Sequence, residues 1–236
     1  MGVAVVAQVS TLMGLGFEET GGKRKPGKTS VPEQGFSLLE LIAVISIIMI
    51  LSAITVEAVQ RATRTMRLHE AAVSYSNLLQ QARVRAVRDD KYYSVLTTPG
   101  AGNVPPTAFV DLAQNGVYAA GDPMMMFPAG VSPRTFASGP NVAGLEAQFL
   151  PPGPGSLLTV NTTAAGPVFG TRGLPCTPTA AGPNATCPYL SAAGLPTAYI
   201  SFMQNTQSGS WMAVTVTPAG RIRQWVYDGG NWTALN

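Results

Sequence analysis

A long apolar segment constrains this chain more than any other feature of its sequence. Residues 36–56 carry a single charge, Glu40. At a rise of 1.5 Å per residue, a helix of this length spans about 30 Å, the thickness of the hydrocarbon core of a bilayer. A carboxylate in lipid costs roughly 2.5–3.5 kcal/mol at the bilayer centre and less near its edge. The segment therefore predicts a transmembrane helix in which Glu40 has a partner. The simpler alternative is a signal anchor with an unpaired glutamate.

The residues before this segment have the composition of a leader rather than of a folded core. Residues 23–28 contain four Lys or Arg beside Pro and Gly. A secretory signal peptide places its cleavage site after the apolar stretch, whereas the candidate site here, Gly35, precedes it. We expect residues 1–35 to be removed, with translation starting at either Met1 or Met13.

The junction between leader and apolar segment has a specific pattern. Residues 35–40 are Gly-Phe-Ser-Leu-Leu-Glu, and they resemble the processing site of type IV prepilins and type II secretion pseudopilins. The resemblance implies that a prepilin peptidase cuts after Gly35 and methylates the new amino terminus at Phe36. It also implies that Glu40 pairs with that amine of a neighbouring subunit when pilins assemble into a filament. A buried carboxylate without a partner is strongly destabilising, so this pair would fix the axial position of each subunit.

The same resemblance gives the expected orientation. Basic residues flank both ends of the apolar segment, so charge alone does not orient it. The family's processing implies a cytoplasmic N-terminus, a single pass through the bacterial inner membrane, a periplasmic or other extracytoplasmic head, and incorporation into a pilus or pseudopilus. One departure from the family is Glu57, which stands where many members have proline. We expect it to be solvated or paired with Arg61.

A second helical pattern continues beyond the membrane segment. Apolar residues recur there at three- and four-residue spacing, which is typical of an amphipathic helix. They are Leu68, Ala72, Tyr75, Leu79, Ala82 and Ala86. No Gly or Pro interrupts residues 36–98. We expect one helix that continues to about Lys91, about 55 residues and roughly 80 Å long. Residues 36–56 are its transmembrane half, and residues 57–98 are assigned to its amphipathic half. A coiled coil would require a stricter heptad.

Residues 99–236 differ in composition and are rich in Gly, Pro, Ala and Thr, with few charges. Short runs that favour strands alternate there with turn signals. The expected strands are residues 108–112, 146–150, 157–161 and 199–204, followed by a hairpin of residues 211–217 and 221–227. Residues 124–127, Met-Met-Met-Phe, are expected to form a strand or to fill the core rather than to form a site. The predicted fold class is α+β, with the long N-terminal helix packed on a C-terminal antiparallel β-sheet head.

The two cysteines, Cys176 and Cys187, lie in a loop rich in Pro, Gly and Thr. Outside the cytoplasm we expect them to form a disulfide, which would stabilise the fold by about 3 kcal/mol. Two thiols make a poor metal site, and the only histidine, His69, lies on the helix. The sequence contains no nucleophile–base set and no phosphate-binding glycine loop. We therefore expect no enzyme activity, no metal or other cofactor and no small-molecule substrate.

Two further segments resemble the GspH/FimT group of pilin-like proteins. Residues 77–87 are Asn-Leu-Leu-Gln-Gln-Ala-Arg-Val-Arg-Ala-Val, and residues 214–223 are Val-Thr-Val-Thr-Pro-Ala-Gly-Arg-Ile-Arg. The resemblance implies a minor pseudopilin of type II secretion or a minor pilin of a type IV pilus, placed near the filament tip. A major structural pilin is a third alternative that these segments favour less.

Some members of that group bind DNA during natural transformation through a Gly-Arg-x-Arg motif, which residues 220–223 match. Alternation along a strand places Arg221 and Arg223 on one face, where both could contact phosphates. However, residues 92–236 contain four basic and four acidic side chains, which is a weak electrostatic footprint for DNA. The alternative is that these arginines protect an edge strand from aggregation.

Overall fold

The structure is a computed structural model that describes residues 37–102, 104–150, 158–161, 166–180, 182–192 and 194–235. The expected leader and the processing residues Gly35 and Phe36 lie outside these described residues. The chain divides into two compact units, Met1–Ile48 and Met49–Asn236.

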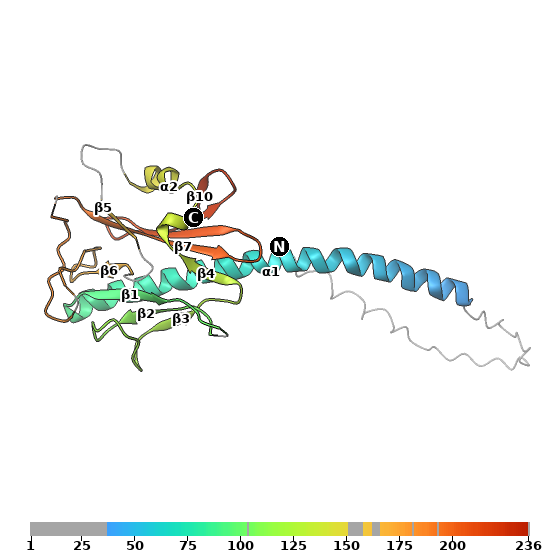
Figure 1. Cartoon of the computed structure of the whole chain (residues 1–236), viewed down its shortest axis with the longest axis horizontal. Helices are drawn as coiled ribbons and strands as arrows, with labels where there is room; N and C mark the ends of the chain where they lie inside the picture. The colour runs from blue at the N-terminus through green and yellow to red at the C-terminus, as the bar shows by residue number, and fades with distance from the viewer. Residues whose placement is uncertain are drawn as a thin grey trace, which may run out of the picture. The chain divides into compact units, whose positions relative to one another are not determined.

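One helix, α1, spans Leu38–Asp89 and has 52 residues (Figure 1). It ends earlier than the expected boundary at residue 98, because Asp90 adopts a left-handed conformation with φ of 49°. The following residues, Tyr93–Thr98, form strand β1. Aromatic and β-branched side chains dominate this stretch and favour a strand. The absence of Gly and Pro permitted a longer helix but did not require one.

The first sheet has four strands in the order β3-β2-β1-β6, and all of its pairs are antiparallel. The bounds of the strands not yet given are β2 Thr107–Asp111, β3 Met124–Met126 and β6 Val168–Phe169. The strand expected at residues 108–112 is therefore present with a small shift in its ends. Of the two alternatives for residues 124–127, the strand is the one found, at Met124–Met126.

The second sheet is larger and follows the order β10-β9-β8-β7-β4. Its strands are β4 Val131–Arg134, β7 Thr197–Asn205, β8 Trp211–Val216, β9 Ile222–Tyr227 and β10 Trp232–Leu235. These strands pair antiparallel, as expected for the head. A further strand, β5 Leu158–Asn161, pairs with β7 in parallel, which the sequence did not predict.

A short helix, α2 Val142–Phe149, replaces the strand expected at residues 146–150. A 3₁₀ turn, η1 Phe136–Ser138, precedes it. The Asn141 side chain accepts the N–H of Gly144 at 3.2 Å and caps the helix. Leu145 and Phe149, four positions apart, are both buried against aromatic residues of the second sheet. That prediction was wrong because a cap and two apolar residues at helical spacing outweigh a short apolar run.

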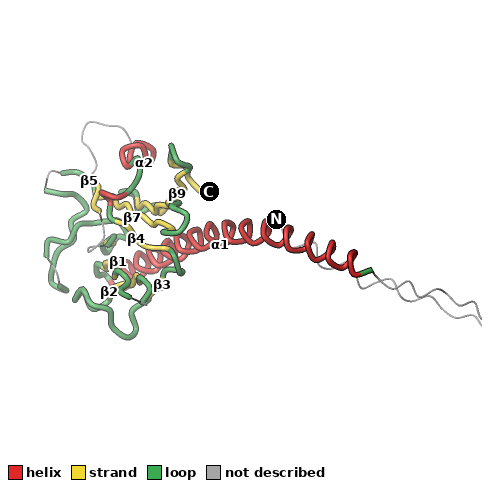
Figure 2. Tube along the Cα trace, turned by 45° about the vertical axis from the view of Figure 1, so that its right-hand side comes forward, coloured by secondary structure: helices red, strands yellow, loops and turns green. Residues whose placement is uncertain are grey.

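The later turns of α1 run alongside strands of both sheets (Figures 1 and 2). Every residue of the predicted apolar stripe is buried in one core that also contains Val95 and Val110 of the first sheet and Met203 and Val214 of the second. Four alanines on this face let the strands approach the helix closely. They are Ala71, Ala72, Ala82 and Ala86. The α+β fold predicted from the sequence is therefore confirmed.

Two buried polar side chains in these cores have partners. The Tyr75 hydroxyl lies 3.2 Å from the hydroxyl oxygen of Ser201, and the Trp225 indole donates to the Thr215 hydroxyl at 2.9 Å. Burial raises the pKa of Tyr75 to about 12. These bonds satisfy groups that would otherwise destabilise the fold.

Candidate functional site

The first turn of α1 holds the predicted assembly residue, Glu40. Ser37 precedes the helix, and its hydroxyl accepts the N–H of Glu40 at 3.2 Å. Its carbonyl accepts the N–H groups of Glu40 and Leu41 at 3.1 and 3.2 Å. This is the Ser-x-x-Glu pattern of a capping box, a signal that is visible in the sequence but was missing from the predicted site. A carboxylate in the first turn also interacts favourably with the helix dipole.

The turns after Glu40 present large apolar side chains that the described chain does not cover. Ile47 is 57% exposed and Met49 is 68% exposed. Among the described residues, α1 is the one helix long and apolar enough to cross a membrane. An uncovered apolar surface of this extent indicates a lipid or protein environment.

Two hydroxyl groups of this segment form hydrogen bonds within the helix. The hydroxyls of Ser46 and Thr55 each donate to the carbonyl four residues earlier, at 2.8 Å. At the end of the segment, Glu57 and Arg61 form an exposed ion pair of 3.4 Å. Such surface pairs contribute little to stability.

The hairpin of β8 and β9 contains the second candidate motif. Its turn closes with the Thr217 N–H donating to the Arg221 carbonyl at 2.9 Å. Gly220 has φ of 75°, and its carbonyl accepts Nη1 of Arg83 at 2.9 Å. A Cβ at Gly220 would lie 2.9 Å from the carbonyl oxygen of Gly173. The two segments that resemble the GspH/FimT group, one on α1 and one in the hairpin, are therefore in direct contact.

The hairpin arginines line a groove between α1 and the edge of the second sheet. Arg221 is exposed and precedes β9, whereas Arg223 is half-buried in β9 opposite Thr215. The groove has a volume of about 540 Å³, and α1 contributes polar side chains that include Asn77 and Gln80. We call it the hairpin groove. Only its strand side was predicted, because nothing in the sequence shows which helix face lies opposite a hairpin.

The cysteines are joined in the structure. Cys176 and Cys187 form a disulfide with a Cα–Cα distance of 5.4 Å. The Tyr199 hydroxyl donates to the Cys176 carbonyl at 2.6 Å. Burial raises the pKa of the Tyr199 hydroxyl, so this hydroxyl remains a donor at neutral pH. The disulfide closes the loop, and the hydrogen bond from Tyr199 ties the loop to strand β7.

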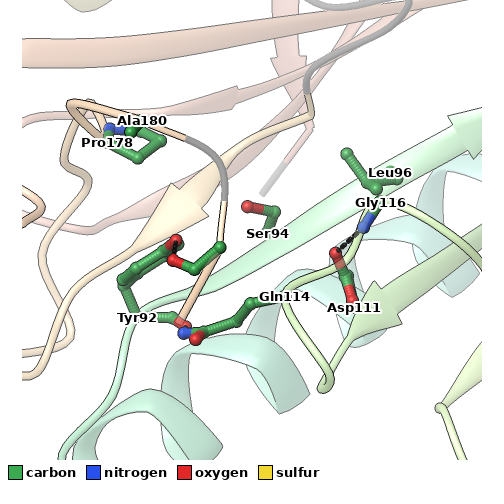
Figure 3. A pocket seen from close by; sticks show the side chains of 9 residues that line it. Tyr92, Ser94, Leu96, Asp111, Gln114, Gly116, Pro178 and Ala180 are labelled. Carbon is green, nitrogen blue, oxygen red and sulfur yellow. Dashed lines mark hydrogen bonds between the residues drawn. The ribbon is translucent and has the colours of Figure 1, made fainter. Parts of the chain in front are cut away.

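A smaller pocket of about 240 Å³ lies between β1, β2 and the disulfide loop (Figure 3). The Asp111 carboxylate accepts the N–H of Gly116 at 2.7 Å. The Gln114 amide donates to the Tyr92 carbonyl, and the Tyr92 hydroxyl donates to the Gly182 carbonyl. These polar groups already have partners in the chain and hold loops in place. In the part of the chain that the structure describes, no group of three or more His, Cys, Asp or Glu is placed to hold a metal ion.

Comparison with known proteins identifies one segment. Residues 32–56 match the family model of the prokaryotic N-terminal methylation motif. No curated protein and no solved structure matches the chain. The match confirms the resemblance of residues 35–40 to the processing site of type IV pilins and pseudopilins, and it implies processing by a prepilin peptidase and assembly with other pilins. Together with the apolar helix, it fits a single-pass protein anchored in the inner membrane.

Proposed function

We propose that this type IV pilin-like chain is a minor pilin or pseudopilin of the GspH/FimT group, assembled near the tip of a type IV pilus or a type II secretion pseudopilus. In this proposal the peptidase cuts after Gly35 and methylates Phe36, and the head is extracytoplasmic. The observation that carries the proposal is the uncovered apolar helix directly behind a methylation motif. Such a surface has lipid around it before assembly and other pilins around it afterwards.

The proposed role of Glu40 follows from its place in that helix. Among the described residues its carboxylate has no ion-pair partner. Surrounded by apolar helices of other subunits, an unpaired carboxylate is costly, and the Phe36 amine of a neighbour would supply the opposite charge. The bond from its backbone N–H to the Ser37 hydroxyl, which caps the helix, is a separate, local feature. A test must therefore separate charge from capping.

Assignment to a minor subunit rests on the two resembling segments and on their contact through Arg83 and Gly220. The helix segment and the hairpin segment therefore belong to one packed unit of the head. A major structural pilin remains the less favoured alternative, because neither segment points to it.

The second candidate function is DNA binding through Arg221 and Arg223. It is favoured by the groove that both side chains line. Two phosphate contacts would give a log–log dependence of affinity on salt with a slope of about −2 and weak binding. A shallower slope, or one that Arg221→Ala/Arg223→Ala leaves unchanged, would count against this candidate.

The assembly proposal is tested by expressing variants of the full chain with prepilin peptidase and the partner pilins. Glu40→Gln keeps the size of the side chain and removes its charge, whereas Ser37→Ala removes the cap and keeps the charge. We expect mass spectrometry to find a methylated Phe36 terminus in wild type and in both variants. We expect Glu40→Gln to be absent from sheared or purified filaments and Ser37→Ala to be present.

Two controls define the result. Gly35→Leu should block cleavage, and Glu57→Ala, at the exposed end of the segment, should assemble normally. Recovery of only the full-length wild-type chain would contradict the processing proposal. Normal incorporation of Glu40→Gln would contradict the pairing of Glu40 with an amine.

A further inference from the structure

The hairpin groove presents hydrogen-bond donors on both of its walls. Arg221 and Arg223 come from the hairpin, and His69, Asn77 and Gln80 come from exposed positions of α1. Between the walls, Nε2 of Gln224 donates to the Ser76 hydroxyl at 3.1 Å and ties β9 to the helix. The groove is therefore held in shape by the fold and does not depend on an occupant.

These donors lack acceptors in the part of the chain that the structure describes. The side chains of Arg221 and Arg223 form no ion pair there, and no Asp or Glu is among the described residues that line the groove. Other arginines do have acceptors, since Arg83 donates to a carbonyl and Arg88 to Asp89. The groove thus has a surplus of positive charge and of donors.

We infer that the hairpin groove binds an acidic peptide segment of a partner protein through the carboxylates of its Asp or Glu side chains. A guanidinium presents paired N–H groups that match a carboxylate in bidentate geometry. The amide side chains of Asn77 and Gln80 both donate and accept, so they can pair with the backbone of an extended peptide. A concave site brings both kinds of contact to one short segment.

A peptide fits this groove better than a nucleic acid does. Single-stranded nucleic acids are held by a basic track and by aromatic side chains on which bases stack. No Phe, Tyr or Trp is among the described residues that line the groove. Beyond Arg221 and Arg223, residues 92–236 contain only two more basic side chains. On the strand side a long polyanion would therefore lie mostly on a neutral surface, whereas a short acidic segment would place its charges within the groove. Residues 61–91 of α1 carry seven basic and three acidic side chains, so the test includes an oligonucleotide as a comparison ligand.

The inference is tested with the unassembled full chain in an uncharged detergent, so the outcome does not depend on the filament proposal. The probe is a fluorescent peptide of alternating glutamate and alanine, and binding is followed by anisotropy. Its glutamine counterpart and a single-stranded oligonucleotide of equal charge are the comparison ligands. Arg221→Gln/Arg223→Gln should weaken binding of the acidic peptide by about tenfold or more, since hydrogen bonds to charged groups are lost.

Matched variants separate a specific site from overall charge. Arg85→Gln/Arg172→Gln changes the net charge equally outside the groove and should leave affinity unchanged. Gln80→Glu should weaken binding, and Gln80→Lys should strengthen it, because this exposed position changes the charge of the groove without disturbing the core. Unchanged thermal melting would show that each variant is folded.

Three results would overturn the inference. The first is that the glutamine peptide binds as tightly as the acidic peptide. The second is that both pairs of arginine substitutions lower the affinity equally. The third is that Gln80→Glu and Gln80→Lys bind the acidic peptide with the same affinity. Tighter binding of the oligonucleotide, abolished by the hairpin pair alone, would assign the groove to DNA instead.

Discussion

Gly220 is a position where backbone conformation and packing both require glycine. Its φ of 75° lies in the region that side chains with a Cβ rarely adopt. Its carbonyl holds Arg83 of the helix, and its Cα faces the Gly173 carbonyl. The first residue of the Gly-Arg-x-Arg motif therefore has a structural role that is independent of any ligand.

This role predicts the effect of a methyl group. Gly220→Ala should destabilise the fold by about 1–2 kcal/mol from the left-handed conformation alone, and further because of the 2.9 Å approach to the Gly173 oxygen. Gly229→Ala is the matched control, since Gly229 also has positive φ but has no atom within 4 Å of the added Cβ. Denaturant unfolding of both variants should show the larger loss for Gly220→Ala, and equal losses would disprove the close contact.

At the scale of elements, the helices and strands with a clear apolar periodicity were predicted from the sequence. The α1 stripe, the β8–β9 hairpin and the strands near residues 108–112 and 199–204 were predicted because apolar spacing and turn residues determine them locally. Two errors, at residues 93–98 and 146–150, occurred where local signals conflict. Both depend on single residues, Asp90 and Asn141, that adopt positive φ.

The candidate site was predictable only in parts. The methylation motif and the hairpin arginines are visible in the sequence, and so was the Ser37–Glu40 capping box. The position of Asn77 and Gln80 opposite the hairpin was not visible in the sequence, because it depends on which face of the helix the second sheet covers. The strand expected at residues 157–161 is present as β5, but its parallel pairing with β7 was not predicted for a similar reason, since β7 is distant in the sequence.

The disulfide loop is the element whose stability is most easily tested. Removing the crosslink with Cys176→Ser/Cys187→Ser should lower the free energy of unfolding by about 3 kcal/mol in the chain-entropy model.

A second variant tests a single hydrogen bond of the same loop. Tyr92→Phe, which removes only the hydrogen bond to Gly182, should lower the free energy of unfolding by about 1 kcal/mol. Calorimetry with and without a reductant measures both effects. Reductant should lower the melting temperature of wild type and of Tyr92→Phe but not of the serine variant; a wild type that is insensitive to reductant would contradict the prediction.

At the scale of the whole molecule, buried tyrosines make the fold sensitive to alkali. Burial raises the pKa of Tyr75 to about 12, from an ordinary value near 10. Between these values the unfolded chain loses the phenolic proton while the folded chain keeps it, so ionisation favours unfolding. The stabilisation is complete below pH 10 and decreases as the pH rises towards 12. The raised pKa of Tyr199 acts in the same direction.

The free energy of unfolding should therefore fall above pH 10 by about 1.4 kcal/mol per pH unit for each such tyrosine. Tyr75→Phe should make this pH dependence shallower, although it also removes the bond to Ser201. Tyr118→Phe, at an exposed position, is the control and should leave the slope unchanged. Denaturant titrations from pH 8 to pH 12 measure the slopes, and an identical slope in all three proteins would refute the assignment.

The internal bonds of Ser46 and Thr55 have a consequence for how the helix changes surroundings. Because both hydroxyls bond to carbonyls of their own helix, leaving lipid for a protein bundle does not require either bond to be broken. The transfer therefore costs no side-chain hydrogen bond at these two positions. In the proposed assembly Glu40 is the exception, because its charge would be unpaired in lipid and paired with an amine in the filament. Under the proposed pairing, this one carboxylate would make the filament more favourable than the bilayer for a helix that is otherwise equally suited to both.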